Sequence, residues 1–204
     1  MTAATRLLLG ILIAAAVVAA GLLGYSAFRM LTDDGTAAGS RILGEAQLGG
    51  PFALVDGDGR TRTDADFRGR LMLIYFGYTF CPDVCPTELQ TMAQAVELLG
   101  DDAAKVQPLF ITVDPERDTP EVMKAYAENF GAGMIGLTGT PEQVAQAARA
   151  YRVYYRKATS ESATDYLMDH SSIVYLMGRD GRFLTHFSLG TTPEDMAKSI
   201  HKFL

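Results

Sequence analysis

The sequence predicts an α/β fold, in which a central mixed sheet is flanked by helices, with an N-terminal transmembrane helix. One observation is the alternation of short apolar runs with stretches of helical periodicity over residues 71–152, which is typical of parallel βαβ units. A second is the pair of apolar runs that flank Gly178-Arg179-Asp180-Gly181, a turn sequence typical of a β-hairpin. A third is the uncharged stretch Leu7–Phe28, whose length matches the ~20 apolar residues of a membrane-spanning helix.

The apolar stretch divides the chain into an anchor and one globular domain. We expect a transmembrane anchor at residues 7–28, after a cytoplasmic N-terminus at residues 1–6. A linker rich in small residues follows at residues 29–50, and residues 51–204 form the domain. A cleaved signal peptide is the rival interpretation, but its apolar region is usually shorter and ends in a defined cleavage site.

The charges around this stretch predict its orientation. Arg6 precedes it, whereas Asp33 and Asp34 follow it soon after Arg29, so the N-terminus should stay in the cytoplasm. The domain would then lie in a bacterial periplasm, on a single-pass inner-membrane anchor. The alternative is the mitochondrial inner membrane, with the domain facing the intermembrane space, and both compartments permit disulfides. The net charge of -6 argues against binding to nucleic acid.

Each element of the domain has a local signal. An N-terminal hairpin is predicted around Asp56-Gly57-Asp58-Gly59, and Leu71–Phe76 is apolar enough for a strand covered on both faces. Apolar residues then recur at helical spacing from Leu89 until Gly100, which suits a helix end. The other expected elements are a strand at 108–113, a helix at 120–130, a strand at 134–137, a helix at 141–152, strands at 172–177 and 182–187, and a helix from Pro193. A parallel sheet that gains a hairpin and a final helix is the layout of a thioredoxin-like fold.

The only two cysteines, Cys81 and Cys85, lie between the first parallel strand and its helix, and a proline follows each. Three other helices open with Thr-Pro-Glu, at Thr119, Thr140 and Thr192, where threonine caps and proline fills the first position. Cys85 takes the equivalent slot of its helix, at a capping cost of about 1 kcal/mol, which indicates a functional role. We expect both cysteines in a turn ahead of the helix, whose N-terminus should lower their pKa values.

Several roles are open to this pair of thiols. A structural disulfide would close a very short loop, so it would add little stability. Catalytic thiol-disulfide exchange would use Cys81 and Cys85 at a spacing longer than the usual CxxC. A peroxidase would need a lone thiolate and a polarising arginine, for which Arg117 is the candidate. A soft metal site for copper(I) or zinc would need a third ligand.

Only three histidines could supply an imidazole to that site. His201 lies on the last helix, where a solvated face is expected, and His186 lies within a strand, where a structural role is expected. His170 precedes a hairpin strand that should run antiparallel to its neighbours, so its position lies at the sheet edge that carries the cysteines. Asp169 is a candidate to orient the imidazole, and a turn-capping role is the alternative for it.

Three segments together carry a family resemblance. YFGYTFCPDVCPTEL, FITVDPERDTPEVMKAY and DHSSIVYLMGRDGRF resemble the Sco/SenC family of membrane-tethered copper chaperones for cytochrome c oxidase assembly, over roughly residues 45–204. The resemblance implies copper ligands at Cys81, Cys85 and His170. Phe80 stands where some relatives have histidine, so no fourth ligand is expected at that position.

The expected function is therefore that of a copper chaperone rather than primarily an enzyme. Two thiolates and a neutral imidazole suit copper(I) and also resemble the equatorial set that holds copper(II) in cupredoxins. The expected partner is the copper-bearing subunit of cytochrome c oxidase, whose binuclear copper centre would receive the metal. The alternative is a tethered thiol-disulfide reductase that keeps the cysteines of that subunit reduced. Other copper carriers or thioredoxin-like reductants would be further partners.

Charged residues after the second parallel strand admit two interpretations. Asp114, Glu116, Arg117 and Asp118 lie at the same sheet edge as the cysteines. One interpretation is turn capping with an internal arginine–carboxylate pair. The other is docking to a partner or tuning of the copper site.

Overall fold

The computed structural model describes residue 21, residues 48–158 and residues 166–204. Within those residues, no helix is both long enough and apolar enough to cross a membrane. The anchor expected at residues 7–28 lies outside the described residues, apart from Gly21. Most of the linker expected at residues 29–50 lies outside them as well.

A seven-stranded mixed sheet forms the centre of the globular part. Its strands follow the order β2-β1-β5-β4-β3-β8-β9. The central strands β3, β4 and β5 are parallel, β8 runs antiparallel to β3, and β1 runs antiparallel to β5. The bounds are β1 Ala53–Asp56, β2 Thr61–Thr63, β3 Leu71–Gly77, β4 Val106–Thr112, β5 Ile135–Thr138, β8 Ile173–Met177 and β9 Phe183–Ser188.

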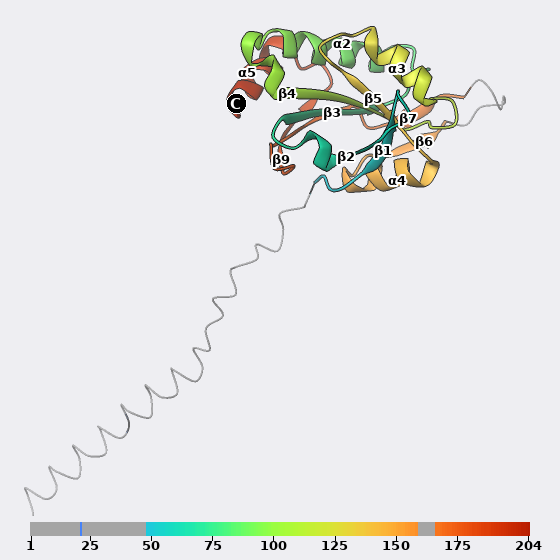
Figure 1. The fold of residues 1–204 in the computed structure, drawn as a ribbon, viewed down its shortest axis with the longest axis horizontal. Coiled ribbons are helices and arrows are strands. Elements are labelled where there is room, and N and C mark those ends of the chain that lie inside the picture. The colour runs from blue at the N-terminus through green and yellow to red at the C-terminus, as the bar shows by residue number, and fades with distance from the viewer. Residues whose placement is uncertain (1–20, 22–47, 159–165) are drawn as a thin grey trace, which may run out of the picture. The chain divides into compact units, whose positions relative to one another are not determined.

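Helices cover both faces of this sheet. Figure 1 shows α2, α3 and α5 along one face and α4 along the other. The α/β class and the mixed sheet flanked by helices are therefore confirmed, as are the two predicted hairpins, β1–β2 and β8–β9. The bounds are η1 Asp64–Phe67, α2 Val84–Glu97, η2 Gly100–Lys105, α3 Pro120–Glu128, α4 Pro141–Ala150 and α5 Pro193–His201.

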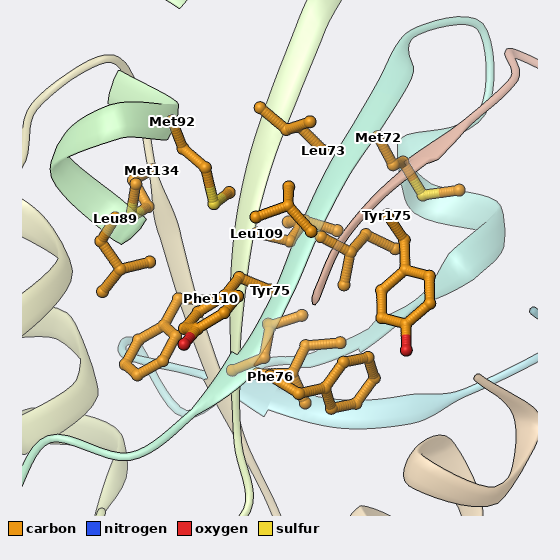
Figure 2. Close-up of a cluster of buried hydrophobic side chains, with 14 of the residues drawn as sticks. Met72, Leu73, Tyr75, Phe76, Leu89, Met92, Leu109, Phe110, Met134 and Tyr175 are labelled. Atoms are coloured by element: carbon orange, nitrogen blue, oxygen red, sulfur yellow. The ribbon is translucent and has the colours of Figure 1, made fainter. Parts of the chain in front are cut away.

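The core is built on β3 and β4, which are buried at every position. Because both faces of these strands are covered, their sequences are apolar runs rather than alternating patterns. Successive side chains of β3 point to opposite faces. In Figure 2, Tyr75 points to the side of Leu89 and Phe110, whereas Phe76 points to the side of Tyr175. Tyr75 therefore lies beneath helix α2, which carries Cys85.

The threonine caps are present as predicted. The side chains of Thr119, Thr140 and Thr192 accept hydrogen bonds from backbone amides in the first turns of α3, α4 and α5. Helix α2 differs, because it begins at Val84 after Asp83 and has no side-chain cap. The prediction that Cys85 takes the capping slot is therefore wrong, and Cys85 is the second helical residue. Proline is tolerated directly after it because first-turn amides have no intrahelical acceptor.

Two short strands were not predicted. β6 Tyr155–Lys157 and β7 Met168–His170 form a separate two-stranded antiparallel sheet in which Tyr155 pairs with His170. His170 therefore ends β7 and does not directly begin the hairpin strand β8. Strands of three residues carry almost no periodic signal, which explains why the sequence did not predict them.

Candidate metal centre

Cys81, Cys85 and His170 come together at one edge of the sheet. Their sulfur and nitrogen ligand atoms all lie within 4.8 Å of one another. Cys81 lies in the turn after β3, Cys85 in the first turn of α2, and His170 at the end of β7. Among the described residues, His186 and His201 take no part in this cluster, and both are exposed.

Backbone amides order the cysteine turn. The amide of Cys81 donates to the Tyr78 carbonyl at 3.3 Å, and the amide of Cys85 is directed at the Cys81 sulfur at 3.4 Å. Cys81 is half-buried, whereas Cys85 is completely buried. The two thiols therefore differ in their access to solvent.

The environment of Cys85 disfavours its thiolate in the metal-free protein. Burial is the largest cause and raises the pKa of the Cys85 thiol, although the backbone of Tyr78 acts in the opposite direction. The prediction that the helix N-terminus lowers the pKa is therefore wrong for Cys85, because desolvation outweighs the helix dipole here. A bound cation would reverse this preference, since a coordinating thiol is deprotonated outright.

This asymmetry predicts unequal alkylation. In the reduced, metal-free protein, iodoacetamide should modify Cys81 at least about tenfold faster than Cys85, because the reaction needs an accessible thiolate. Peptide mass spectrometry against time measures both rates. In guanidinium chloride the two rates should become similar, and equal rates in the folded protein would contradict the assignment.

The imidazole of His170 is held in one tautomer. Its Nδ1 lies 3.1 Å from the Ser171 carbonyl, which can only accept, so Nδ1 carries the proton. The Nε2 lone pair then faces the Cys85 sulfur, 3.3 Å away. Burial lowers the pKa of His170, which favours the neutral, ligating form. Asp169 instead pairs with Arg156 at 3.0 Å, so the Ser171 carbonyl takes the orienting role considered for Asp169.

Two buried tyrosines line the same region. The rings of Tyr75 and Tyr78 meet the His170 ring edge-on, with centroid distances of 6.0 and 5.8 Å. The Tyr75 hydroxyl lies 3.9 Å from the Cys85 sulfur. These contacts restrict the imidazole and one thiol to a narrow range of positions.

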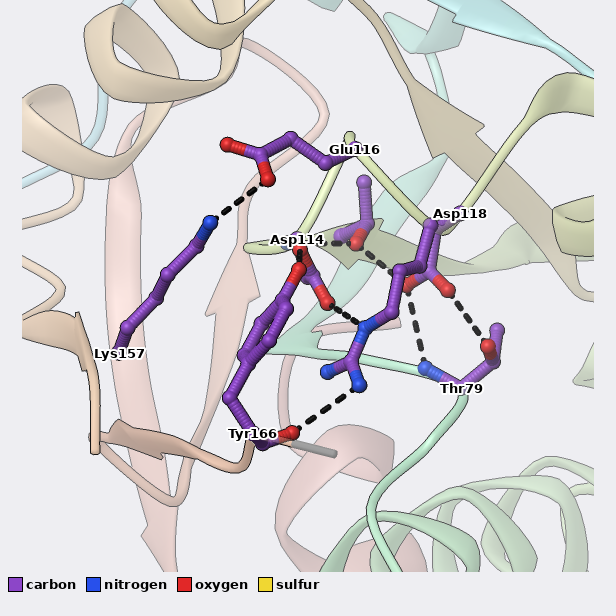
Figure 3. A network of polar contacts seen from close by, with 8 residues as sticks. Thr79, Asp114, Glu116, Asp118, Lys157 and Tyr166 are labelled. Carbon is purple, nitrogen blue, oxygen red and sulfur yellow. Dashed lines mark hydrogen bonds and ion pairs between the residues drawn. The ribbon is translucent and has the colours of Figure 1, made fainter. Parts of the chain in front are cut away.

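The loop at residues 114–118 contacts the cysteine turn. Arg117 pairs with Asp114, so the internal arginine–carboxylate pair of one sequence interpretation is present. The buried Asp118 carboxylate accepts from the Thr79 amide at 3.1 Å and from the Thr112 hydroxyl at 2.6 Å. Figure 3 shows these contacts of Asp114 and Asp118. Thr79 therefore helps to hold the cysteine turn in place, a role that the sequence alone did not indicate.

The donor set defines which ions fit. Two sulfurs and one imidazole nitrogen are soft and borderline donors, which suit copper(I), and the same set can hold copper(II). A structural zinc site normally has four protein ligands, so the three that the described residues bring together are one short. The residues present therefore fit copper better than structural zinc.

Comparison with known proteins agrees with this chemistry. The sequence model of the SCO1/SenC family matches residues 40–204. The chain belongs to the SCO1/SenC family. The matched range includes the complete cluster and extends slightly beyond the resemblance read from the three segments.

Individual SCO1/SenC relatives cover most of this chain. The human mitochondrial SCO1 homolog is 46% identical over 162 residues, which are 78% of this chain and 54% of the relative. The bovine mitochondrial SCO2 homolog is 44% identical over 168 residues, which are 81% of this chain and 63% of the relative. The chain thus spans only part of the length of these two curated relatives.

Solved SCO1/SenC structures share the fold. The copper-bound structure of ScoI from Bradyrhizobium japonicum has a TM-score of 0.72 and 46% identity, covering 77% of this chain and 99% of that one. The copper-bound structure of yeast Sco1 has a TM-score of 0.71 and 38% identity, covering 76% and 87%. The similarity therefore extends over nearly the whole of each solved domain.

Proposed function

We propose that this SCO1/SenC member binds one copper ion through the sulfurs of Cys81 and Cys85 and through Nε2 of His170. The observation that carries the proposal is the approach of these ligand atoms to within 4.8 Å of one another. The orientation of His170 supports it, because a ligating histidine usually donates its second N–H to a carbonyl or carboxylate. The copper-bound structures of two relatives support the choice of metal.

We further propose that copper is the cargo of this protein rather than its resident cofactor. The recipient would be the binuclear copper centre in the copper-bearing subunit of cytochrome c oxidase. Cys81 is the more open of the two thiols to an incoming partner thiolate, because it is half-buried whereas Cys85 is completely buried. Exchange of the sulfur ligands would therefore begin at Cys81 and end at Cys85.

The membrane anchor at residues 7–28 belongs to the same proposal. It would hold the domain of residues 51–204 in the periplasm, or in the mitochondrial intermembrane space. The uncharged stretch and the charges on its two sides support this arrangement. An anchor would keep the domain close to a membrane-bound oxidase.

A competition titration tests the copper site. The reduced, full-length chain in detergent is titrated with copper(I) against a chelator of known affinity. We expect one tight equivalent, and His170→Ala should raise the Kd at least about tenfold, since even the loss of an outer-sphere contact costs 10–100-fold. His186→Ala is the matched control, because His186 is exposed on β9 and outside the cluster.

The second candidate function is thiol-disulfide exchange, which the unequal exposure of the two cysteines favours. The Cys81 thiolate would attack a disulfide of the partner and form a mixed disulfide. Cys85 would then displace the partner thiol, so two electrons pass to the partner and Cys81–Cys85 becomes the disulfide. Weak copper binding, or binding indifferent to His170, would refute the copper proposal and leave this function as the better explanation.

A further inference from the structure

Arg117 contacts the segment that leads to His170. Its Nη1 donates to the Tyr166 carbonyl at 3.0 Å, and its Nε pairs with the Asp114 carboxylate. The Tyr166 hydroxyl donates to the same carboxylate at 2.7 Å. Figure 3 shows the Tyr166 hydroxyl directed at the Asp114 carboxylate. Tyr166 lies two residues before β7, the strand that ends at His170.

The same guanidinium lies over three aromatic rings. Its carbon is 3.7 Å from the centroid of Tyr166, 4.5 Å from that of Phe80 and 5.8 Å from that of Tyr78. Cations within about 6 Å of a ring centroid are attracted to the face of the ring. Arg117 Nη2 is buried and has no hydrogen-bond partner among the described residues, so the rings add to the stabilisation that the Asp114 carboxylate gives this guanidinium.

These contacts connect the two segments that carry the cluster. Phe80 directly precedes Cys81, and Tyr78 accepts the hydrogen bond from the Cys81 amide. Tyr78 also packs edge-on against the His170 ring. One side chain therefore joins the cysteine turn to the histidine-bearing segment, although the two are far apart in the sequence.

We infer that Arg117 is a positioning residue, which holds the histidine-bearing segment against the cysteine turn before any metal binds. The inference rests on the proposed copper site. Groups held in their binding geometry lose less conformational freedom on binding, which increases affinity. The neighbouring Asp118 also holds the cysteine turn, through Thr79, so the loss of Arg117 should displace the segment that carries His170 more than it displaces that turn.

A double-mutant cycle on the reduced, full-length chain tests this role. Arg117→Met keeps much of the side-chain length but removes the charge and the donors. We expect it to raise the copper(I) Kd about tenfold in the wild-type background, within the range for loss of an outer-sphere contact. In the His170→Ala background it should change the Kd by less than about twofold, because the effect passes through His170. Equal effects in both backgrounds would overturn the inference.

A spectroscopic signature provides a second measurement. In the copper(II) complex, nitrogen hyperfine coupling from His170 should be weaker or heterogeneous in Arg117→Met. An unchanged spectrum would overturn the inference. The control is Arg62→Met, which removes a partly buried ion pair with Asp56 at 2.7 Å and should leave both the spectrum and the Kd unchanged.

A conservative variant separates position from stability. Arg117→Lys keeps a positive charge beside Asp114 but loses the planar fork that reaches the Tyr166 carbonyl. It should fold normally and still show the weakened affinity, so it replaces the methionine variant in the cycle if that variant does not fold. Full affinity in Arg117→Lys would overturn the inference. If His170→Ala left the copper(I) Kd of the otherwise wild-type chain unchanged, the proposed site itself would be refuted, and this inference with it.

Discussion

Cys85→Ser should abolish tight copper(I) binding while leaving the fold intact. Serine is close in shape to cysteine, and its hydroxyl can donate to Nε2 of His170 as the thiol does at 3.3 Å. A hydroxyl stays protonated at neutral pH and is a hard donor, so it does not replace a thiolate toward copper(I). The Kd should rise by more than about a hundredfold, beyond the 10–100-fold typical of losing an outer-sphere contact.

Two measurements accompany this variant. Competition titration gives the Kd, and thermal unfolding of the metal-free protein shows that the fold is retained. Cys81→Ser is the paired variant and should also weaken binding strongly, since it removes the other thiolate. A Cys85→Ser protein that binds within threefold of the wild type would show that Cys85 is not a ligand.

Much of the fold could be predicted because its signals are local. The apolar composition of β3 and β4 predicts buried strands. The three Thr-Pro-Glu tripeptides predict helix starts, because threonine is a favourable capping residue. The topology then followed from the order of these elements. It also predicted that His170 lies near the cysteines, which the structure bears out.

Other features depend on tertiary context. The pairing of β6 with β7 has no signature in strands of three residues, so the strand that carries His170 was missed. The direction of the Cys85 pKa shift was predicted wrongly, because the helix dipole was visible in the sequence but complete burial was not. The sequence left two interpretations of Arg117 open for the same reason. Its aromatic neighbours Phe80, Tyr78 and Tyr166 lie far from it in the sequence and meet it only in the folded chain.

The packing of Gly77 under the cysteines leads to the second large prediction. A Cβ at this position would lie 2.8 Å from the Cys85 sulfur, 3.0 Å from Cε1 of Tyr75 and 3.1 Å from Cε2 of Phe110. All three side chains are fully buried, so none can move into solvent. Gly77→Ala should therefore lower the free energy of unfolding by about 1–3 kcal/mol, the usual cost of overpacking. It should also weaken copper binding, because the Cys85 sulfur must move.

Urea denaturation with an unchanged m-value measures the stability effect, and the competition titration measures the effect on copper. Gly50→Ala is the control. Gly50 is half-buried, and a Cβ there would meet a single atom, the Ala150 Cβ at 3.3 Å. The control should destabilise the protein less than Gly77→Ala does and should leave copper binding unchanged, because its one contact is longer and involves no ligand.

The origin of the effect can be isolated by combining Gly77→Ala with Cys85→Ala. Removing the sulfur relieves the closest contact, so Gly77→Ala should cost less in the Cys85→Ala background than in the wild type. The difference between the two costs is the coupling energy of the Gly77–Cys85 contact. Equal costs in both backgrounds would place the strain at Tyr75 and Phe110 instead, and the strand end would then not control the position of the thiol.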